Sequence, residues 1–256
     1  MPRFYIDCPL TAGARVDLPE ALAHHALRTL RLTDGDTLTL FNGQGGEWQA
    51  RLSAPPGRGA RASAELLAFD PREAELSYRV VIAQGLSGGD KMDWTIEKAV
   101  ELGAAAIQPL ACARSVVRLD ADRAAKRVRH WQALCESAAA QCGRNRVPAV
   151  LAPRALTDWL ASVKADLAAA ANQANHAHQQ ALVLVPGARD RLAALPRPPA
   201  GTTTLLLIGP EGGLDETELA AAGAAGLRPV SLGPRVLRTE TAAAAALATL
   251  AAAWGE

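Results

Sequence analysis

Two glycine-proline turns in the C-terminal half of the sequence carry the side chains best suited to chemistry. The first turn is IGPEGGLDETE, residues 208–218, and it follows an apolar run over 204–208 that predicts a buried strand. Its glycines permit positive φ and let a ligand approach the backbone, while Glu211 supplies a carboxylate for a cationic or hydroxyl-bearing ligand. Asp215 followed by Glu218 predicts a helix start with a capping box. The alternative is a tight strand-to-helix turn without a ligand.

The second turn is LGPRVLRTETA, residues 232–242, and it again follows a predicted strand. We expect Thr239 to be the N-cap of the alanine-rich helix that follows, with Glu240 near the positive helix end. These helix-end roles account for Thr239 and Glu240, but they give no structural reason for an arginine at position 238. Because ligands in open α/β sheets bind beyond the carboxyl ends of strands, the two turns together predict one cleft walled by both.

Two further stretches contain clustered charges. AAQCGRNRVP, residues 139–148, places Arg144 and Arg146 after the helix-ending signal Gly143, where two guanidinium groups suit phosphate or an anionic transition state. GDKMDWTIEKAVELG, residues 89–103, opens a helix whose charged residues are also explained as pairs along the helix surface.

Several enzyme classes are disfavoured by missing patterns. Neither turn has the GxGxxG pattern of dinucleotide binding, the lysine of a phosphate loop or the GxSxG elbow of a serine hydrolase. The four cysteines form no CxxC pair, so we expect neither a zinc site nor disulfides. Four of the five histidines sit as an adjacent pair at 24 and 25 and within a polar stretch at 176 and 178, and the histidines predict no metal site.

The charge distribution is more informative than the net charge of +1. Basic side chains outnumber acidic ones between residues 114 and 146, with Arg114, Arg118, Arg123, Lys126, Arg127, Arg129, Arg144 and Arg146 against Asp120, Asp122 and Glu136. This cluster is compatible with nucleic-acid binding, and the alternative is a solvated helix face. No apolar run reaches the ~18 residues of a membrane span, and the N-terminus shows no export signal.

The sequence changes character near residue 72. Residues 1–72 predict short strands over 37–41 and 48–52, an Asn-Gly turn between them and one helix over 21–30, which suggests a small β-barrel. Residues 73–256 alternate strand and helix, so we expect an open α/β sheet with helices on both faces. The stretch over 168–180 is expected to be a surface excursion. The expected strands are 79–84, 106–110, 182–185, 204–208 and 228–232, and the expected helices are 92–102, 122–142, 215–225 and 239–254.

At these motifs the sequence resembles a known family. The two turns look like the knot motifs of the SPOUT RNA methyltransferases. Together with HHALRTLRLTDGD (24–36), LFNG (40–43) and the stretches over 89–103 and 139–148, they resemble the 16S ribosomal RNA (uracil-N3)-methyltransferase family, RsmE. These motifs occur in the family's order and span nearly the whole chain.

The resemblance implies a fold, a reaction and partners. The fold would be a PUA-like RNA-binding domain over 1–72 and a SPOUT methyltransferase domain over 73–256 with a deep C-terminal trefoil knot. The chain would act as a cytoplasmic homodimer that binds S-adenosyl-L-methionine in the knot. Its substrate would be 16S rRNA, within the small ribosomal subunit, and its product N3-methyluridine. No metal would be needed, because the leaving group of methyl transfer from a sulfonium is a neutral thioether.

The resemblance also suggests roles for individual residues. Arg238 is the first candidate to stabilise the uracil imide anion, followed by Arg144 or Arg146 from the same or the partner subunit. Glu240 would orient an arginine or act as the base. The cofactor would be held by Gly209, Pro210, Glu211, Gly212, Gly213, Leu232, Gly233, Leu237, Arg238 and Thr239. The RNA backbone would be bound by Arg3, Arg28, Arg31, Arg123 and Arg127.

Three alternative functions stay open at this point. The first is a SPOUT enzyme that methylates a ribose 2′-hydroxyl instead of a base. The second is a non-catalytic RNA-binding protein with the same fold, which would not bind S-adenosylmethionine. The third is a nucleotide-dependent oxidoreductase, which the missing GxGxxG pattern disfavours.

Overall fold

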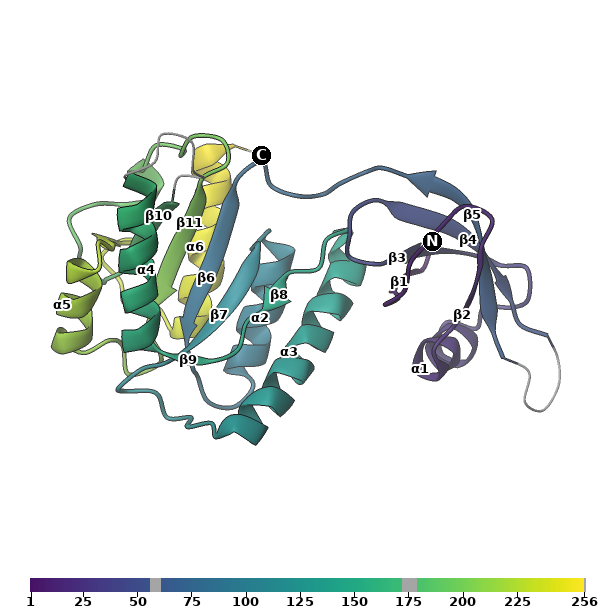
Figure 1. The fold of residues 1–256 in the computed structure, drawn as a ribbon, viewed down its shortest axis with the longest axis horizontal. Helices are drawn as coiled ribbons and strands as arrows, with labels where there is room; N and C mark the ends of the chain where they lie inside the picture. Colours follow the sequence, from purple (N-terminus) through teal and green to yellow (C-terminus); the bar gives the residue numbers. More distant parts are fainter. Residues whose placement is uncertain (56–60, 172–178, 256) are drawn as a thin grey trace. The chain divides into compact units, whose positions relative to one another are not determined.

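The structure is a computed structural model that describes residues 1–55, 61–171 and 179–255 (Figure 1). It divides into two compact units. The N-terminal unit contains residues Met1–Glu75 and Glu136–Val147, and the C-terminal unit contains Leu76–Cys135 and Pro148–Glu256. Most of the predicted surface excursion over 168–180 lies outside the described residues, and only its two ends are seen, in a helix and a strand.

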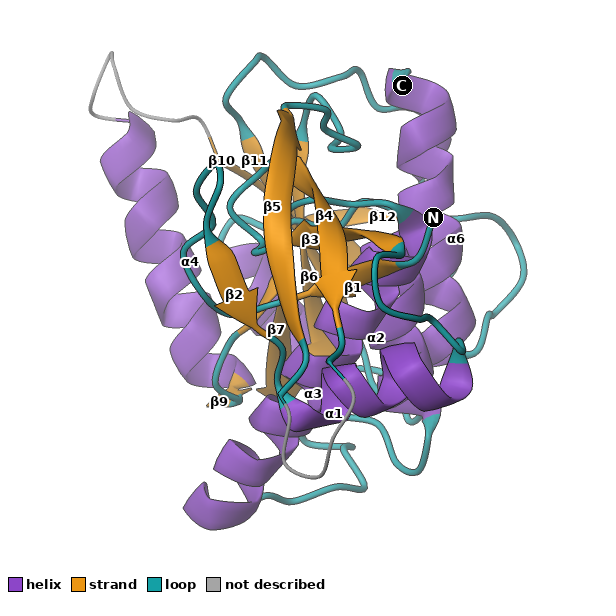
Figure 2. Cartoon of the chain, turned by 90° about the vertical axis from the view of Figure 1, so that its right-hand side faces the viewer, coloured by secondary structure: helices purple, strands orange, loops and turns teal. Residues whose placement is uncertain are grey.

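The N-terminal unit is built on a five-stranded sheet in the order β1-β3-β4-β5-β2 (Figure 2). The predicted strands over 37–41 and 48–52 are confirmed, and the Asn-Gly turn between them has Gly43 at φ 79°. The predicted helix over 21–30 is a short α-helix, α1, that continues as a π-helical turn. The bounds are β1 Arg3–Tyr5, β2 Arg15–Asp17, α1 Glu20–His24, π-helix His25–Thr29, β3 Thr37–Phe41, β4 Glu47–Ser53 and β5 Ser63–Asp70.

Alternating apolar residues of these strands form the core of this unit. Leu38 and Leu40 on β3, Leu52 on β4 and Leu66 on β5 are all buried, and the α1 region contributes Ala26. Burying an aliphatic side chain of this size stabilises a fold by about 1.5–3 kcal/mol. The alternation therefore determines which face of the sheet packs inward.

The C-terminal unit is built on a seven-stranded sheet in which all the pairings are parallel. Its order is β12-β10-β11-β6-β7-β8, with β9 also paired to β7. This confirms the predicted α/β sheet. The strands are β6 Arg79–Gly85, β7 Ala106–Ala111, β8 Ala149–Val150, β9 Arg154–Ala155, β10 Gln179–Leu184, β11 Thr203–Ile208 and β12 Arg228–Val230.

Helices cover both faces of this parallel sheet, as predicted. α4 and α5 pack on one face, and α2 and α6 pack on the other (Figure 1). α4 was not predicted as a helix. The bounds are α2 Lys91–Glu101, α3 Ala121–Cys142, α4 Leu156–Ala171, a 3-10 turn Leu192–Ala194, α5 Glu216–Ala224 and α6 Thr239–Trp254.

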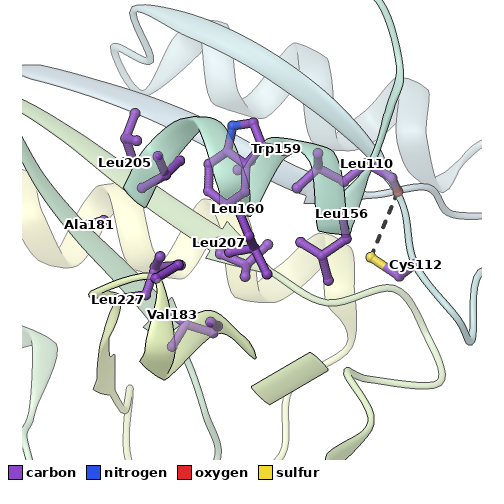
Figure 3. Close-up of a cluster of buried hydrophobic side chains, with 14 residues drawn as sticks. Leu110, Cys112, Leu156, Trp159, Leu160, Ala181, Val183, Leu205, Leu207 and Leu227 are labelled. Atoms are coloured by element: carbon purple, nitrogen blue, oxygen red, sulfur yellow. Dashed lines mark hydrogen bonds between the residues drawn. The ribbon is translucent and has the colours of Figure 1, made fainter. Parts of the chain in front are cut away.

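One hydrophobic core of the C-terminal unit lies between the sheet and α4 (Figure 3). Trp159 and Leu160 of α4 pack over Leu205 and Leu207, which are alternate residues of β11 and so share one face of the sheet. Cys112 lies at the edge of this cluster, and burial followed by the charge of Glu218 raises the pKa of its thiol to about 12. This cysteine is therefore a protonated, buried side chain.

All four cysteines are free thiols. Within the described ranges, no group of three or more histidine, cysteine, aspartate or glutamate residues is arranged to hold a metal ion. Among the helices that the structure describes, none combines the length and the apolar character required to cross a membrane.

Candidate active site at the two glycine-proline turns

A cleft of about 430 Å³ lies in the C-terminal unit, beyond the carboxyl ends of β10, β11 and β12. This volume is within the range of small-molecule sites in proteins. The walls come from three chain segments that leave these neighbouring strands, namely 184–186, 208–214 and 230–242, with Leu219 and Lys91. Both glycine-proline turns therefore line one cleft, as the sequence predicted. All ten residues expected to hold the cofactor are in its lining, although their role as ligands stays a prediction.

The first turn is shaped by glycines at positions where a side chain does not fit. Gly213 adopts φ 68°, a left-handed conformation that costs other residues about 1–2 kcal/mol. A Cβ atom on Gly212 would lie 2.9 Å from Cβ of Arg114, whose Nη1 donates a hydrogen bond of 3.0 Å to the Gly212 carbonyl. A Cβ atom on Gly85, at the end of β6, would lie 2.5 Å from the nitrogen of Pro210. The turn is therefore packed against two neighbouring segments of the unit.

The helix after the first turn begins with the predicted capping box. The backbone N–H of Glu218 donates to Oδ1 of Asp215 at 2.7 Å, and the N–H of Asp215 donates to Oε2 of Glu218 at 3.0 Å. Asp215 is the N-cap of α5. The reciprocal bonds satisfy two helix N–H groups and fix the direction in which the chain leaves the turn.

Glu211 is tied to the start of α2. Its Oε1 accepts hydrogen bonds from the N–H of Gly88 at 2.9 Å and from Nζ of Lys91 at 3.1 Å. Partial burial raises the pKa of Glu211, but the bonds from backbone N–H groups and the contact with Lys91 outweigh burial and hold it below its usual value. Glu211 is therefore ionised at neutral pH and gives this wall of the cleft a fixed negative charge.

Thr239 in the second turn does not cap α6, and this expectation from the sequence was wrong. The N-cap residue is Arg238, which makes no side-chain capping bond, and Thr239 is the first residue of the helix. The hydroxyl of Thr239 instead donates to the carbonyl of Gly209 at 2.6 Å and accepts from Nε2 of Gln84 at 2.8 Å. The hydroxyl is thus used to connect the two turns.

The second turn also brings charged side chains to the cleft. Arg235 and Arg238 are both exposed and line the cleft, and within the described ranges neither guanidinium has a hydrogen-bond or ion-pair partner. Glu240 lies in the first turn of α6, and its Oε2 is buried with no partner in the part of the chain that the structure describes. Gly233, at φ 137°, precedes these residues. The lining therefore presents free cationic groups next to an unsatisfied carboxylate oxygen.

Three predicted functional arginines belong to the N-terminal unit and are engaged there. The side chain of Arg144 is 4% exposed, and its guanidinium forms an ion pair of 2.5 Å with Glu75. Arg146 pairs with Glu73 at 3.3 Å but is more than half exposed. Arg3 pairs with Glu47, contacts the side chain of Asn145, and donates to carbonyl groups at the end of α3. The catalytic role of Arg144 and Arg146 stays a prediction.

The remaining predicted RNA-binding residues are exposed. In the N-terminal unit, Arg28 lies in the π-helix that follows α1, and Arg31 lies just after it. In the C-terminal unit, Arg123 and Arg127 lie on the first turns of α3. Arg31 adopts φ 57°, which is the one non-glycine positive φ among the described residues. Arg123 pairs with Asp120 in an exposed contact of 3.3 Å, which contributes little to stability.

Sequence reasoning missed three residues that shape the cleft. Lys91 holds Glu211, Arg114 lies over Gly212, and Gln84 contacts Thr239. Only Gln84 had a signal of its own, because it is a polar residue at the end of an otherwise apolar strand. Lys91 and Arg114 come from other elements of the fold, and their contacts depend on tertiary structure.

Comparison with protein families shows two matches. Residues 74–251 match the model of an RNA methyltransferase domain, and residues 18–68 match the model of an RNA methyltransferase PUA domain. The first match covers more than half of the chain.

Individual relatives agree with these matches. The chain is 33% identical to ribosomal RNA small subunit methyltransferase E of Bacillus subtilis, over 89% of this chain and 86% of that protein. It is also 33% identical to the protein of the same name from Mycobacterium bovis, over 95% of this chain and 88% of that protein.

Two solved structures resemble the whole chain. One is a ribosomal RNA small subunit methyltransferase E from Neisseria gonorrhoeae bound to S-adenosyl methionine, with a TM-score of 0.85 and 37% identity. The other is a Legionella pneumophila methyltransferase with bound SAM, with a TM-score of 0.86 and 32% identity. Each comparison covers 100% of this chain and 98% of the other.

Proposed function

Because the chain belongs to the ribosomal RNA small subunit methyltransferase E family, we propose that it transfers a methyl group from S-adenosylmethionine to N3 of a uridine in 16S rRNA. The observation that carries this proposal is the cleft itself, in which both glycine-proline turns and Arg238 meet beyond the ends of three parallel strands. This is where open α/β sheets bind ligands.

The residues of the cleft fit S-adenosylmethionine, which supplies an electrophilic methyl group on a cationic sulfonium. Glu211 is held ionised, and a buried oxygen of Glu240 lacks a hydrogen-bond partner among the described residues. Both carboxylates favour a cationic ligand. The adenine, ribose and methionine parts of the cofactor would be held by the backbone of residues that all line the cleft, Gly209, Gly212, Leu232, Gly233, Leu237 and Thr239.

Arg238 is proposed to activate the uracil. The N3 atom of neutral uracil has no available in-plane lone pair, so it must lose its proton before or during methyl transfer. A guanidinium next to a uracil carbonyl stabilises the negative charge that develops on the imide. Arg238 is exposed at the cleft, and no other described group engages it. Glu240, two residues further on, would orient this arginine or accept the proton.

Methyl transfer requires alignment of donor and acceptor. An in-line displacement is accelerated when the reacting atoms are held in place, and such positioning contributes about 7–11 kcal/mol in favourable cases. The cleft walls are fixed by the capping box at Asp215 and by the contacts of Glu211 with Lys91. These contacts preorganise the first turn.

RNA binding is proposed for two surfaces. The PUA-like domain over 1–72 would present Arg3, Arg28 and Arg31, and the methyltransferase domain over 73–256 would present Arg123 and Arg127. The last four of these arginines are exposed and can contact phosphates directly, whereas Arg3 is engaged with Glu47. Arg144 and Arg146 are proposed as second candidates for the catalytic guanidinium.

The proposal includes features of the family resemblance that reach beyond the described contacts. The N-terminal sheet would form part of a PUA-like barrel, and the segment around the two turns would form a deep trefoil knot. The chain would act as a homodimer on the small ribosomal subunit in the cytoplasm.

Nucleoside analysis of the product tests the proposed reaction. The purified protein is incubated with S-adenosylmethionine and either deproteinised 16S rRNA or small subunits from a strain that lacks this activity. Digestion to nucleosides and mass spectrometry should then show N3-methyluridine in at least one of the two reactions. A 2′-O-methylated nucleoside would instead support the ribose methyltransferase, and no methylated nucleoside from either substrate would support the non-catalytic protein.

A further inference from the structure

A buried amide connects the two turns of the cleft. Gln84 is completely buried near the end of β6, where it is in register with Ile208 of β11, the residue before the first turn. Its Nε2 donates to Oγ1 of Thr239 at 2.8 Å, and Thr239 donates to the carbonyl of Gly209 at 2.6 Å. A chain of two hydrogen bonds therefore runs from the sheet through the second turn to the first.

The chemistry of these groups fixes the direction of both hydrogen bonds. The Gly209 carbonyl can only accept, so Thr239 must give it its single hydroxyl hydrogen. The hydroxyl oxygen can then only accept, so Gln84 must donate to it from its NH₂ group. If the amide were turned around, two acceptors would face each other. Gln84 thus holds the Thr239 hydroxyl in the orientation that reaches Gly209.

This arrangement has a cost for Gln84 itself. Its Oε1 is buried and has no hydrogen-bond partner among the described residues. A buried carbonyl oxygen without a partner destabilises a fold, and an apolar side chain of similar size would avoid this loss. Its Nε2 also donates to the carbonyl of the next residue, Gly85, at 3.1 Å. The bond to Thr239 is therefore the contact by which this amide reaches the lining of the cleft.

We propose that Gln84 is a positioning residue for cofactor binding, which acts through Thr239 to fix the spacing of the two turns before S-adenosylmethionine enters. Thr239 and Gly209 both line the cleft, whereas Gln84 does not. This inference rests on the function proposed above. It adds a residue from β6, an element with no other assigned role in the reaction.

Gln108 is a matched comparison within the same sheet. It lies on β7 in register with Ala83 and is almost completely buried. Its Nε2 donates to the carbonyl groups of Pro109 and Ala152, both at 2.9 Å, and it does not line the cleft. Gln108 therefore represents a buried glutamine whose role is structural.

The test is a double-mutant cycle on cofactor affinity, measured by calorimetry with Gln84→Met, Thr239→Val and the double variant. Each single variant should raise the Kd for S-adenosylmethionine about five- to tenfold, the size of one neutral buried hydrogen bond. Both changes break the same chain of hydrogen bonds. The Kd of the double variant should therefore be about equal to that of the single variant with the higher Kd. Thr239→Ser keeps the hydroxyl and should restore the affinity to within about twofold.

Thermal unfolding of the cofactor-free protein separates positioning from stability. Gln108→Met should lower the melting temperature more than Gln84→Met while keeping the wild-type Kd. A wild-type Kd in Gln84→Met, or losses that multiply in the double variant, would overturn the inference. If Gln84→Met does not fold, equal Kd values for Thr239→Val and Thr239→Ser overturn it as well. If the wild-type protein itself binds no S-adenosylmethionine, that result contradicts the proposed function and not only the role of Gln84.

Discussion

Among single residues, Arg238 is the one proposed to activate the uracil. Replacing Arg238 by alanine should lower turnover by about 10²-fold or more, which is the usual effect of losing one donor to a developing anion. The Kd for S-adenosylmethionine should stay near the wild-type value, because the guanidinium is assigned to the uracil and Arg238 would contact the cofactor only through its backbone, which alanine keeps. Single-turnover kinetics and calorimetry measure the two quantities.

Arg79→Ala is a suitable control for this substitution, because Arg79 is exposed at the start of β6, at the opposite end of the strand from the cleft. It should behave as wild type in both measurements. Unchanged turnover in Arg238→Ala would remove this arginine from the mechanism and direct attention to Arg144 and Arg146.

The lowered pKa of Glu211 predicts how the free energy of unfolding depends on pH. Its pKa in the folded protein is below the ordinary value of 4.5, so its contacts stabilise the fold above that pH. This contribution is lost as the pH falls through the folded pKa. Between pH 5 and pH 3, the free energy of unfolding should therefore fall more steeply for wild type than for Glu211→Gln. Denaturant unfolding at several pH values measures this, and parallel curves would contradict the assignment.

At the scale of elements, the capping box of α5 fixes how the chain leaves the first turn. Asp215→Ala removes the side chain that accepts from the Glu218 N–H and should lower the free energy of unfolding by about 1 kcal/mol. Thr217→Ala, an exposed change within the same helix, should have an effect within about 0.5 kcal/mol of zero. Equal effects of the two substitutions would show that the cap does not stabilise this helix.

The elements with clear periodicity or turn signals could be predicted from the sequence. The apolar strands over 204–208 and 79–84, the helix over 122–142 and the capping box were all correct to within a residue or two. α4 was missed. The short strands β1 and β2, each of three residues, carry too little pattern to be recognised, and their pairing depends on distant partners.

The candidate site could be predicted only where its residues follow one another in the chain. Both turns and their common cleft follow from sequence, because parallel strands end at one edge of a sheet. The role of Thr239 was predicted wrongly, since its partner Gln84 is 155 residues away. From neighbouring residues alone, a threonine at the start of a helix is expected to be its N-cap. Only the tertiary structure shows that the Thr239 hydroxyl bonds to Gly209 and Gln84 instead.

At the scale of the whole molecule, a basic RNA-binding surface should make affinity depend on salt. If Arg28, Arg31, Arg123 and Arg127 each contact a phosphate, replacing any one of them by alanine should reduce the slope of log affinity against log salt by about 0.7–0.9. Filter binding to an rRNA fragment at several salt concentrations measures the slope. Arg79→Ala is again the control, and an affinity that does not change with salt would contradict this role.

A crystal structure of the protein with S-adenosylmethionine would show directly where the cofactor binds. We expect the cofactor to lie between the first turn, 209–213, and the second, 232–239, with its methyl group facing the side of the cleft that carries Arg238. A cofactor bound at another place, or bound here with its methyl group directed away from Arg238, would contradict the account.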